Sequence, residues 1–196
     1  MLAGSGPTSQ AFTFRSGHIA LDFAATLMFR SAPASALELL TDGDALSRWA
    51  QAAGLADIAP EDTVLPDAIA TREAIYALAL ARIAGAAPAA HDLATLNRHA
   101  AGASLALSLG RDGTLRRSGG AGQLIATLAR EAVELFGGPD AARLRQCSRE
   151  GCTRLYVDHS RGTTRVWCGM RECGNRVNAA VYRRRQAERR RSPRAA

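Results

Sequence analysis

Four cysteines near one end constrain this chain of 196 residues more than any other feature. They form two pairs, Cys147-x4-Cys152 and Cys168-x4-Cys173, which are separated by fifteen residues, and no other cysteine is present. Each pair fits a short turn on which two thiolates converge, and the spacer lets the chain leave a metal ion and return to it. The pattern therefore predicts one tetrahedral Zn²⁺ site. Because four protein ligands leave no open position for water, we expect a structural zinc rather than a catalytic one.

Other uses of these cysteines remain open, namely another metal or a redox function, two disulfides, or four unrelated thiols. Disulfides are typical of oxidising compartments, and the first ten residues lack the basic and apolar regions of a signal peptide. Unrelated thiols would scatter along the chain instead of forming matched pairs. No apolar run approaches the roughly 18 residues that cross a membrane. We therefore expect a cytoplasmic protein with reduced cysteines.

Charge divides the chain in the same place as the cysteines. Residues 143–196 hold fifteen arginines against four acidic residues, a net charge of +11, whereas residues 1–142 hold ten arginines and fourteen acidic residues, a net charge of −4. The two parts add up to the overall charge of +7. Basicity confined to the cysteine-rich end indicates a polyanionic partner for that end.

Apolar periodicity predicts a mainly α-helical N-terminal domain over residues 1–138. Helices are expected over residues 19–29, 41–53, 66–84, 88–100 and 123–136, with a short strand-like run over residues 11–15. Alternating leucines at 105, 107 and 109, followed by Asp112-Gly113, predict one β-hairpin. The predicted fold class is mainly α with a small β-hairpin (α+β), followed by a small four-cysteine zinc module over residues 139–196, with a short helix over 140–145.

Inside the zinc module, two β-prone runs, residues 154–157 and 164–167, predict a hairpin that links the two cysteine pairs. A module of this size buries little apolar surface and depends on its metal for folding. We expect Leu155 or Val157 to form a miniature core with Trp167.

The chain after Cys173 suits a helix, on which Val177 and Val181 stand four residues apart for docking. Seven arginines lie between residues 183 and 194, and Glu188 offsets little of their charge. Phosphates would neutralise such a cluster. The alternatives are a solvated helix end, an acidic protein or a membrane surface. Candidate nucleic-acid contacts are Arg161, Arg165, Arg176, Arg183, Arg184, Arg185, Arg189 and Arg190, although Arg176 could equally orient the second cysteine turn.

The segment from Trp167 to Arg176, WCGMRECGNR, resembles the CGNR zinc-finger family of bacteria, whose members are described as stress-induced regulators of transcription. Residues 17–26, GHIALDFAAT, resemble the start of the ABATE domain, the helical domain that accompanies this finger. In the family pattern an asparagine precedes the threonine, whereas Ala25 stands at that position here. The resemblance covers nearly the whole chain and implies a transcription regulator.

The four histidines do not form a recognisable catalytic array, and the chain has no glycine-rich phosphate loop or nucleophile elbow. We therefore do not expect an enzyme. His18 and Asp22 stand four residues apart and mark the place where an N-terminal pocket for a small-molecule effector would lie.

Two hypotheses about function follow. In the first, the zinc module binds double-stranded DNA through its arginines while the N-terminal domain senses a signal or forms a homodimer. In the second, the chain binds RNA or another protein, and the zinc only shapes a basic surface. A less favoured variant makes the N-terminal domain a small-molecule enzyme.

Overall fold

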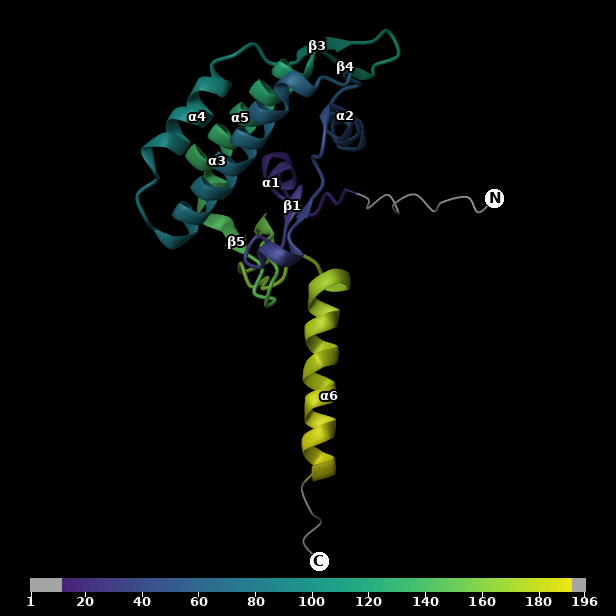
Figure 1. The fold of residues 1–196 in the computed structure, drawn as a ribbon, viewed down its shortest axis with the longest axis vertical. Coiled ribbons are helices and arrows are strands. Elements are labelled where there is room, and N and C mark those ends of the chain that lie inside the picture. Colours follow the sequence, from purple (N-terminus) through teal and green to yellow (C-terminus); the bar gives the residue numbers. More distant parts are fainter. Residues whose placement is uncertain (1–11, 192–196) are drawn as a thin grey trace, which may run out of the picture.

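The computed structural model describes residues 12–191 of the chain (Figure 1). Most of this part is helical, and short two-stranded antiparallel sheets join the helices, which confirms the predicted fold class. The helices are α1 (Ile19–Ala24), α2 (Gly43–Ala52), α3 (Leu65–Ala84), α4 (Ala90–Ala100), α5 (Ala121–Gly137) and α6 (Asn175–Arg191). The strands are β1 (Leu27–Met28), β2 (Leu37–Glu38), β3 (Ala106–Leu109), β4 (Leu115–Ser118), β5 (Leu144–Gln146) and β6 (Leu155–Val157).

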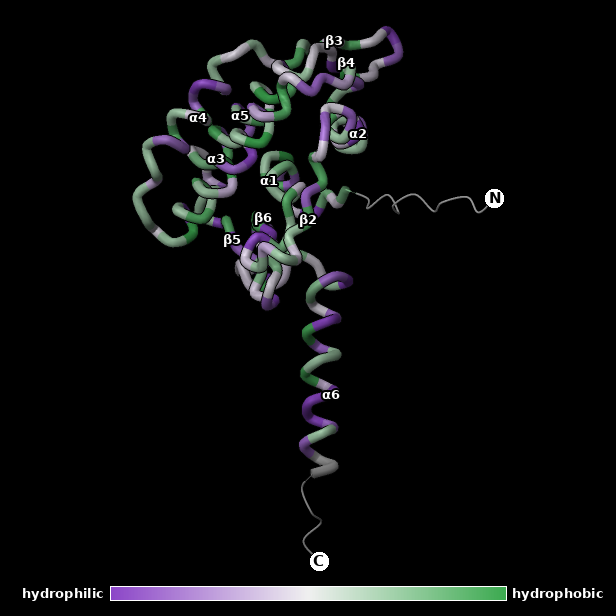
Figure 2. The backbone as a smooth tube through the Cα atoms, in the orientation of Figure 1, coloured by the Kyte–Doolittle hydropathy of each residue, from purple (hydrophilic) through white to green (hydrophobic). Residues whose placement is uncertain are grey.

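The helices α3, α4 and α5 pack side by side, and α1 lies across α3 and α5 (Figure 1). Their apolar faces meet in one large core, in which Trp49 and Phe23 are buried with ring centroids 5.0 Å apart. In Figure 2 the hydrophobic colour gathers on these helices and fades along α6. Burial of this apolar surface is the main stabilising contribution in the helical body.

Local signals in the sequence explain where the helices begin and end. Asp42 caps α2, because its side chain accepts a hydrogen bond from the Ala45 N–H at 2.7 Å. Gly85 ends α3 in the left-handed conformation, with φ at 65°, which a glycine adopts without steric cost. These ends lie close to the predicted ones, and the β3–β4 hairpin turns at Asp112-Gly113 as predicted.

The strands β5 and β6 pair antiparallel, with Leu144 opposite Val157 and Gln146 opposite Leu155. Side chains alternate across β6. Leu155 and Val157 belong to the large core of the helical body, whereas Tyr156 packs with Trp167 and the four cysteines. β6 therefore contributes side chains both to the core of the helical body and to the zinc module.

Two predictions for the N-terminal segment were wrong. The described residues 12–15 form no strand, and Ala11 lies outside the described part. The helix predicted over residues 19–29 ends at Ala24, because the Thr26 hydroxyl and amide both bond to the Phe23 carbonyl and turn the chain into β1. The β1–β2 pair was not predicted.

Three predictions for the zinc module also need correction. Residues 164–167 form no strand, because the Arg165 N–H donates to the Asp158 carboxylate at 3.0 Å and residues 155–157 pair with β5. The helix expected over residues 140–145 is a 3-10 turn, Pro139–Arg143, after which Leu144 enters β5. The miniature core contains Tyr156 in place of Leu155 or Val157.

The final helix forms as predicted, but it does not dock along its length. It projects away from the body (Figure 1), and Val181 is 44% exposed although Val177 is half-buried. Its first turn is held because a single-turn π-helix, Met170–Gly174, runs directly into it. Support for α6 therefore comes from its N-terminal end.

Candidate zinc centre and nucleic-acid interface

The first cysteine pair lies on a turn between β5 and β6. The Cys147 N–H donates to the Arg154 carbonyl at 3.0 Å, which continues the β5–β6 pairing by one bond. The Cys152 N–H donates to the Arg149 carbonyl at 2.9 Å, and Gly151 takes a positive φ of 74° that closes the turn. These bonds turn the chain back so that both sulfurs face the same point.

The second pair is brought together by the π-helical turn. The amides of Cys173 and Gly174 both donate to the Gly169 carbonyl, at 3.1 and 3.0 Å. A Cβ at position 174 would lie 2.6 Å from the Met170 sulfur and 3.1 Å from the Trp167 ring. The glycine of the Cys-Gly-Asn-Arg sequence therefore allows these side chains to close over the site.

The four sulfurs converge as zinc requires. The distances from Cys152 to Cys168, Cys168 to Cys173 and Cys173 to Cys152 are 3.9, 3.5 and 3.8 Å, and all four ligand atoms lie within 4.8 Å of one another. A tetrahedron with Zn–S bonds of about 2.3 Å has edges of about 3.8 Å. Four thiolates at this separation fit one structural Zn²⁺, as the cysteine spacing predicts.

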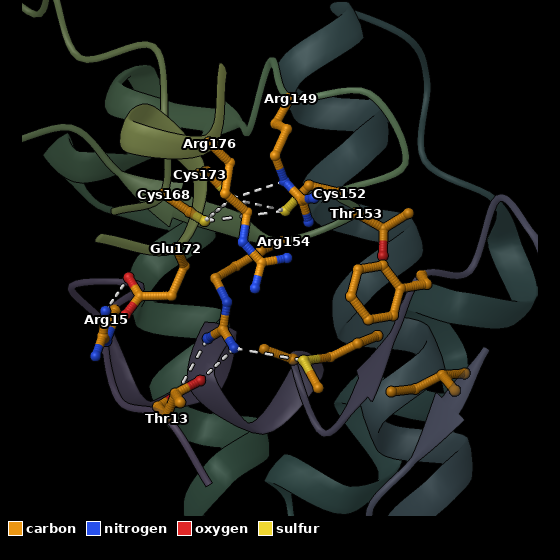
Figure 3. A pocket seen from close by; sticks show the side chains of 14 residues that line it. Thr13, Arg15, Arg149, Cys152, Thr153, Arg154, Cys168, Glu172, Cys173 and Arg176 are labelled. Carbon is orange, nitrogen blue, oxygen red and sulfur yellow. Dashed lines mark hydrogen bonds and ion pairs between the residues drawn. The ribbon is translucent and has the colours of Figure 1, made fainter. Parts of the chain in front are cut away.

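Protons compete with the metal for these sulfurs. A hydrogen bond from the Cys168 thiol lowers the pKa of Cys152 to about 4, and the same bond raises the pKa of Cys168 above its usual value. Burial raises the pKa of Cys173, and the hydrogen bond that Arg149 Nε donates to its sulfur at 3.1 Å opposes this shift (Figure 3). We therefore expect zinc binding to release protons.

Arg165 supports the zinc centre through its contacts with the surrounding loop. Its guanidinium lies 4.3 Å from the centre of the Tyr156 ring, and its Nε donates to the Trp167 carbonyl at 2.8 Å. A further nitrogen donates to the carbonyls of Cys168 and Arg15. These bonds engage Nε and one terminal nitrogen and give Arg165 a structural role in the zinc loop, and its predicted contact with nucleic acid stays a prediction.

The remaining predicted contacts fall in three places. Arg161 is exposed in the loop after β6, and Arg176 lies on the first turn of α6 beside the zinc centre. Arg183, Arg184 and Arg185 are exposed on the projecting part of α6. Arg189 and Arg190 also belong to α6, but their side chains lie outside the described part of the chain. The structure thus places most of the predicted arginines on α6, after the zinc turn, whereas Arg161 and Arg165 lie in the loop that follows β6.

His18 and Asp22 make local contacts in the described structure. His18 caps α1 by accepting the Ala20 N–H at 3.3 Å, and burial lowers its pKa. The Asp22 carboxylate accepts the amides of Arg15 and Ser16, both at 2.9 Å. Both side chains thus fix the segment that enters α1, and the effector pocket expected around them stays a prediction.

Several structural residues were not predicted. Arg154 joins the zinc module to the body, because its guanidinium donates to the Thr13 carbonyl at 3.1 Å and lies 3.7 Å from Asp22. Asp158 is fully buried and accepts the amides of Ser160 and Arg165. The Asx turn at Asp158-x-Ser160 is a signal that could have been recognised, whereas the partners of Arg154 lie more than a hundred residues away.

Comparison with protein-family models follows the same division of the chain. The ABATE model, described as "Putative stress-induced transcription regulator", matches residues 17–139. The chain belongs to the ABATE family. A second model, the CGNR zinc finger, matches residues 143–186 and contains all four cysteines. Both matches were predicted, in this order, from the sequence. No curated protein matches the chain.

In this member of the ABATE family, the two matched segments share their packing. Leu144, Leu155 and Val157 lie within the CGNR match but are buried in the core of the ABATE segment. Backbone bonds add to this contact, because the Val157 N–H donates to the Ser16 carbonyl at 2.7 Å. Within the described residues, none of the helices is both long and apolar enough to cross a membrane.

Proposed function

We propose that this protein is a zinc-dependent, DNA-binding regulator of transcription, in which the zinc module presents α6 to double-stranded DNA. The observation that carries the proposal is the exposure of α6. Arg183, Arg184 and Arg185 are all exposed, and the one ion pair that they form with another described residue joins Arg184 to Glu188 at 3.2 Å. A solvent-exposed ion pair of this kind contributes little, so most of the positive charge on this helix is available to phosphates.

The dimensions of α6 suit a DNA groove. Its 17 residues give a length of about 25 Å, and the major groove of B-form DNA is about 12 Å wide and admits a helix. Successive residues turn by about 100°, so the three consecutive arginines cover more than half of the circumference. They could bind phosphates on both sides of a groove while the helix lies within it.

RNA and protein partners are the competing possibilities. Proteins that bind single strands usually stack bases on several aromatic side chains. Among the described side chains of α6, Tyr182 is the only aromatic one, and it is 64% exposed. A single aromatic residue among arginines favours contact with the backbone of a duplex over stacking on single strands.

The primary test is a selection of genomic DNA fragments by the zinc-loaded protein near physiological salt, followed by sequencing. Enrichment of a few related sites would support a sequence-specific regulator and identify its targets. Recovery of fragments without enrichment would show a non-specific binder. Failure to retain duplex DNA, with retention of RNA in a parallel selection, would replace the proposal by the RNA-binding alternative.

A matched pair of variants tests the role of α6. Arg183, Arg184 and Arg185 are replaced together by Gln, and the control replaces Arg111, Arg116 and Arg117 of the β3–β4 hairpin, with the same change in net charge. We expect only the first variant to lose DNA affinity. If the helix neutralises five phosphates, log affinity should fall against log salt with a slope of about −4.5 in the wild type. Equal losses in both variants would contradict the proposal.

The cellular setting follows from the same proposal. We propose a cytoplasmic location, because the chain must reach DNA and keep four thiols reduced for zinc. A non-enzymatic role and a homodimer remain part of the proposal. Sedimentation of the protein with and without a selected DNA site would measure the oligomeric state.

A further inference from the structure

A cavity of about 230 Å³ lies where the helical body meets the zinc module (Figure 3). Its walls come from three segments that are distant in the sequence. The first wall belongs to the body and consists of the N-terminal segment, β1 and the residue after β1. The first cysteine turn forms the second wall, and the second cysteine turn forms the third together with the start of α6. A molecule in this cavity would touch all three at once.

The floor of the cavity is apolar and includes Met28 and Phe29. Phe29 has a φ of 58°, which places a bulky residue in the left-handed region. Such a conformation costs free energy and persists where the surroundings hold it, often at binding sites. An engineered apolar cavity of about 150 Å³ binds benzene. The zinc ligands Cys152, Cys168 and Cys173 also line the present cavity, so a zinc ion takes part of its volume, and the remainder has room for one aromatic ring.

Three of the four arginines around the cavity are already paired. Arg15 forms an ion pair with Glu172, Arg149 donates to the Cys173 sulfur, and Arg154 binds the Thr13 carbonyl and lies near Asp22. Each of these guanidiniums therefore has a structural partner that a ligand would have to displace.

Arg176 differs from the other three. Its side chain enters the cavity from the first turn of α6 (Figure 3), and it makes no hydrogen bond or ion pair with any other residue that the structure describes. An arginine beside an apolar floor can form two parallel hydrogen bonds with a carboxylate. The zinc centre has a formal charge of −2, because four thiolates carry −4 and one Zn²⁺ carries +2. Arg149 already offsets part of this charge, since it donates a hydrogen bond to the Cys173 sulfur.

We propose that this cavity binds a small molecule that has one aromatic ring and one carboxylate, with the ring against Met28 and Phe29 and the carboxylate on Arg176. Because Phe29 belongs to the body and Arg176 to α6, the bound molecule links the two and controls how α6 is presented. That consequence rests on the proposed DNA-binding function, whereas binding itself does not.

The test uses benzoate as the probe and benzyl alcohol as its uncharged counterpart. Calorimetry on the zinc-loaded full-length protein, without DNA, should give saturable benzoate binding with a Kd on the order of 1 mM, as expected for so small a ligand. The methyl resonance of Met28 should shift during the titration. Benzyl alcohol should bind at least about tenfold more weakly, because it lacks the charge-assisted bonds to Arg176.

Two variants and one control separate the outcomes. Arg176→Gln should lower benzoate affinity about tenfold and leave the affinity for benzyl alcohol unchanged. Ala25→Leu should fill the cavity and abolish binding of both molecules. The control, Arg183→Gln, removes the same charge from α6 outside the cavity and should leave benzoate affinity unchanged. Zinc content, measured in every variant, should stay at the wild-type value.

Three results would overturn the proposal. The first is the absence of saturable benzoate binding. The second is an equal loss in Arg176→Gln and Arg183→Gln, which would make benzoate a counter-ion of the helix. The third is a loss of zinc from Arg176→Gln, which would show that this arginine balances the thiolates. A failure of DNA binding would leave the calorimetric result intact, so the two proposals fail separately.

Discussion

The helical body and the zinc module are stabilised by different interactions. The body buries a continuous apolar core between α1, α3, α4 and α5. The module buries three cysteines and Tyr156, with Cys152 and Trp167 half-buried beside them, and depends on metal bonds and on hydrogen bonds between loops. The β5–β6 pair belongs to both, because its leucines and valine enter the large core while Tyr156 faces the cysteines. The packing is therefore continuous across the point in the sequence where the ABATE match ends and the CGNR match begins.

Removing one zinc ligand should have the largest effect on the module and little effect on the body. In Cys168→Ser we expect bound zinc to fall from one ion to none, because three thiolates no longer complete the tetrahedron, and structural zinc contributes about 10–16 kcal/mol in small modules. Residues 148–174 should become susceptible to proteolysis while the helical circular-dichroism signal of residues 1–136 persists. Val166→Ser, at an exposed position, serves as the control. Retained zinc and an unchanged digestion pattern would refute the single-site interpretation.

A cavity created at Leu155 in β6 should destabilise the helical body, although this residue belongs to the zinc finger. Leu155 is buried in the large core, so Leu155→Ala should lower the free energy of unfolding by about 3 kcal/mol, within the usual range of about 2–5 for such changes. Denaturant unfolding of the zinc-loaded protein measures this, with Val166→Ala as the exposed control. A loss of zinc without any change in the unfolding of the body would instead show that the two regions are energetically independent.

A buried ion pair inside the body provides a test that should leave the zinc module unchanged. Arg72 is only 2% exposed, and its guanidinium binds the Glu38 carboxylate at 2.5 and 2.7 Å. Breaking a fully buried pair costs about 3–5 kcal/mol, but Glu38 is a third exposed and Glu73 remains at 2.8 Å. We therefore expect Glu38→Ala to cost about 2 kcal/mol at full zinc occupancy. Glu61→Ala, at an exposed position, is the control, and equal unfolding curves for the two variants would disprove the role of the pair.

The smallest expected effect is a dependence of body stability on pH. Burial lowers the pKa of His18 below its ordinary value of 6.5, although the nearby carboxylate of Glu131 opposes this shift. The folded state therefore binds the proton less tightly than the unfolded state. The contribution of His18 is complete above pH 6.5 and declines as the pH falls from 6.5 through the folded pKa. His18→Asn keeps an acceptor at the cap but cannot titrate, so its unfolding midpoint should fall less between about pH 7 and 5. An identical decline would assign the effect to other groups.

Sequence reasoning predicted those features that depend on neighbouring residues. The helix ends at Asp42 and Gly85 and the cysteine turns follow from local chemistry, and they were located correctly. The pairing of β5 with β6 was missed, because Leu144–Gln146 is too short to show alternation and its partner lies beyond a cysteine turn. The burial of Arg72 was missed for a related reason, since its partner Glu38 is 34 residues away in the sequence and a charged residue in a helix usually faces solvent.

The candidate site was predicted unevenly for the same reason. The four ligands follow a spacing that only a metal site explains well, so they were identified in full. The arginines share one residue type, and their roles depend on what surrounds each guanidinium. Arg165 faces Tyr156 and backbone carbonyls, whereas Arg183 is exposed on α6. Counting charge along the sequence could not separate these two environments.

The last zinc ligand, Cys173, stands two residues before α6 begins. The metal centre is therefore the pivot about which α6 would rotate as a rigid rod. A helix of 17 residues is about 25 Å long, so a rotation of only about 10° at the pivot would move its far end by about 4 Å. Small displacements at the sulfurs are thereby amplified toward the end of the helix. Arg185 would move farther than Arg176 during the same rotation. How accurately Arg183, Arg184 and Arg185 are positioned therefore depends on the rigidity of the single π-helical turn Met170–Gly174.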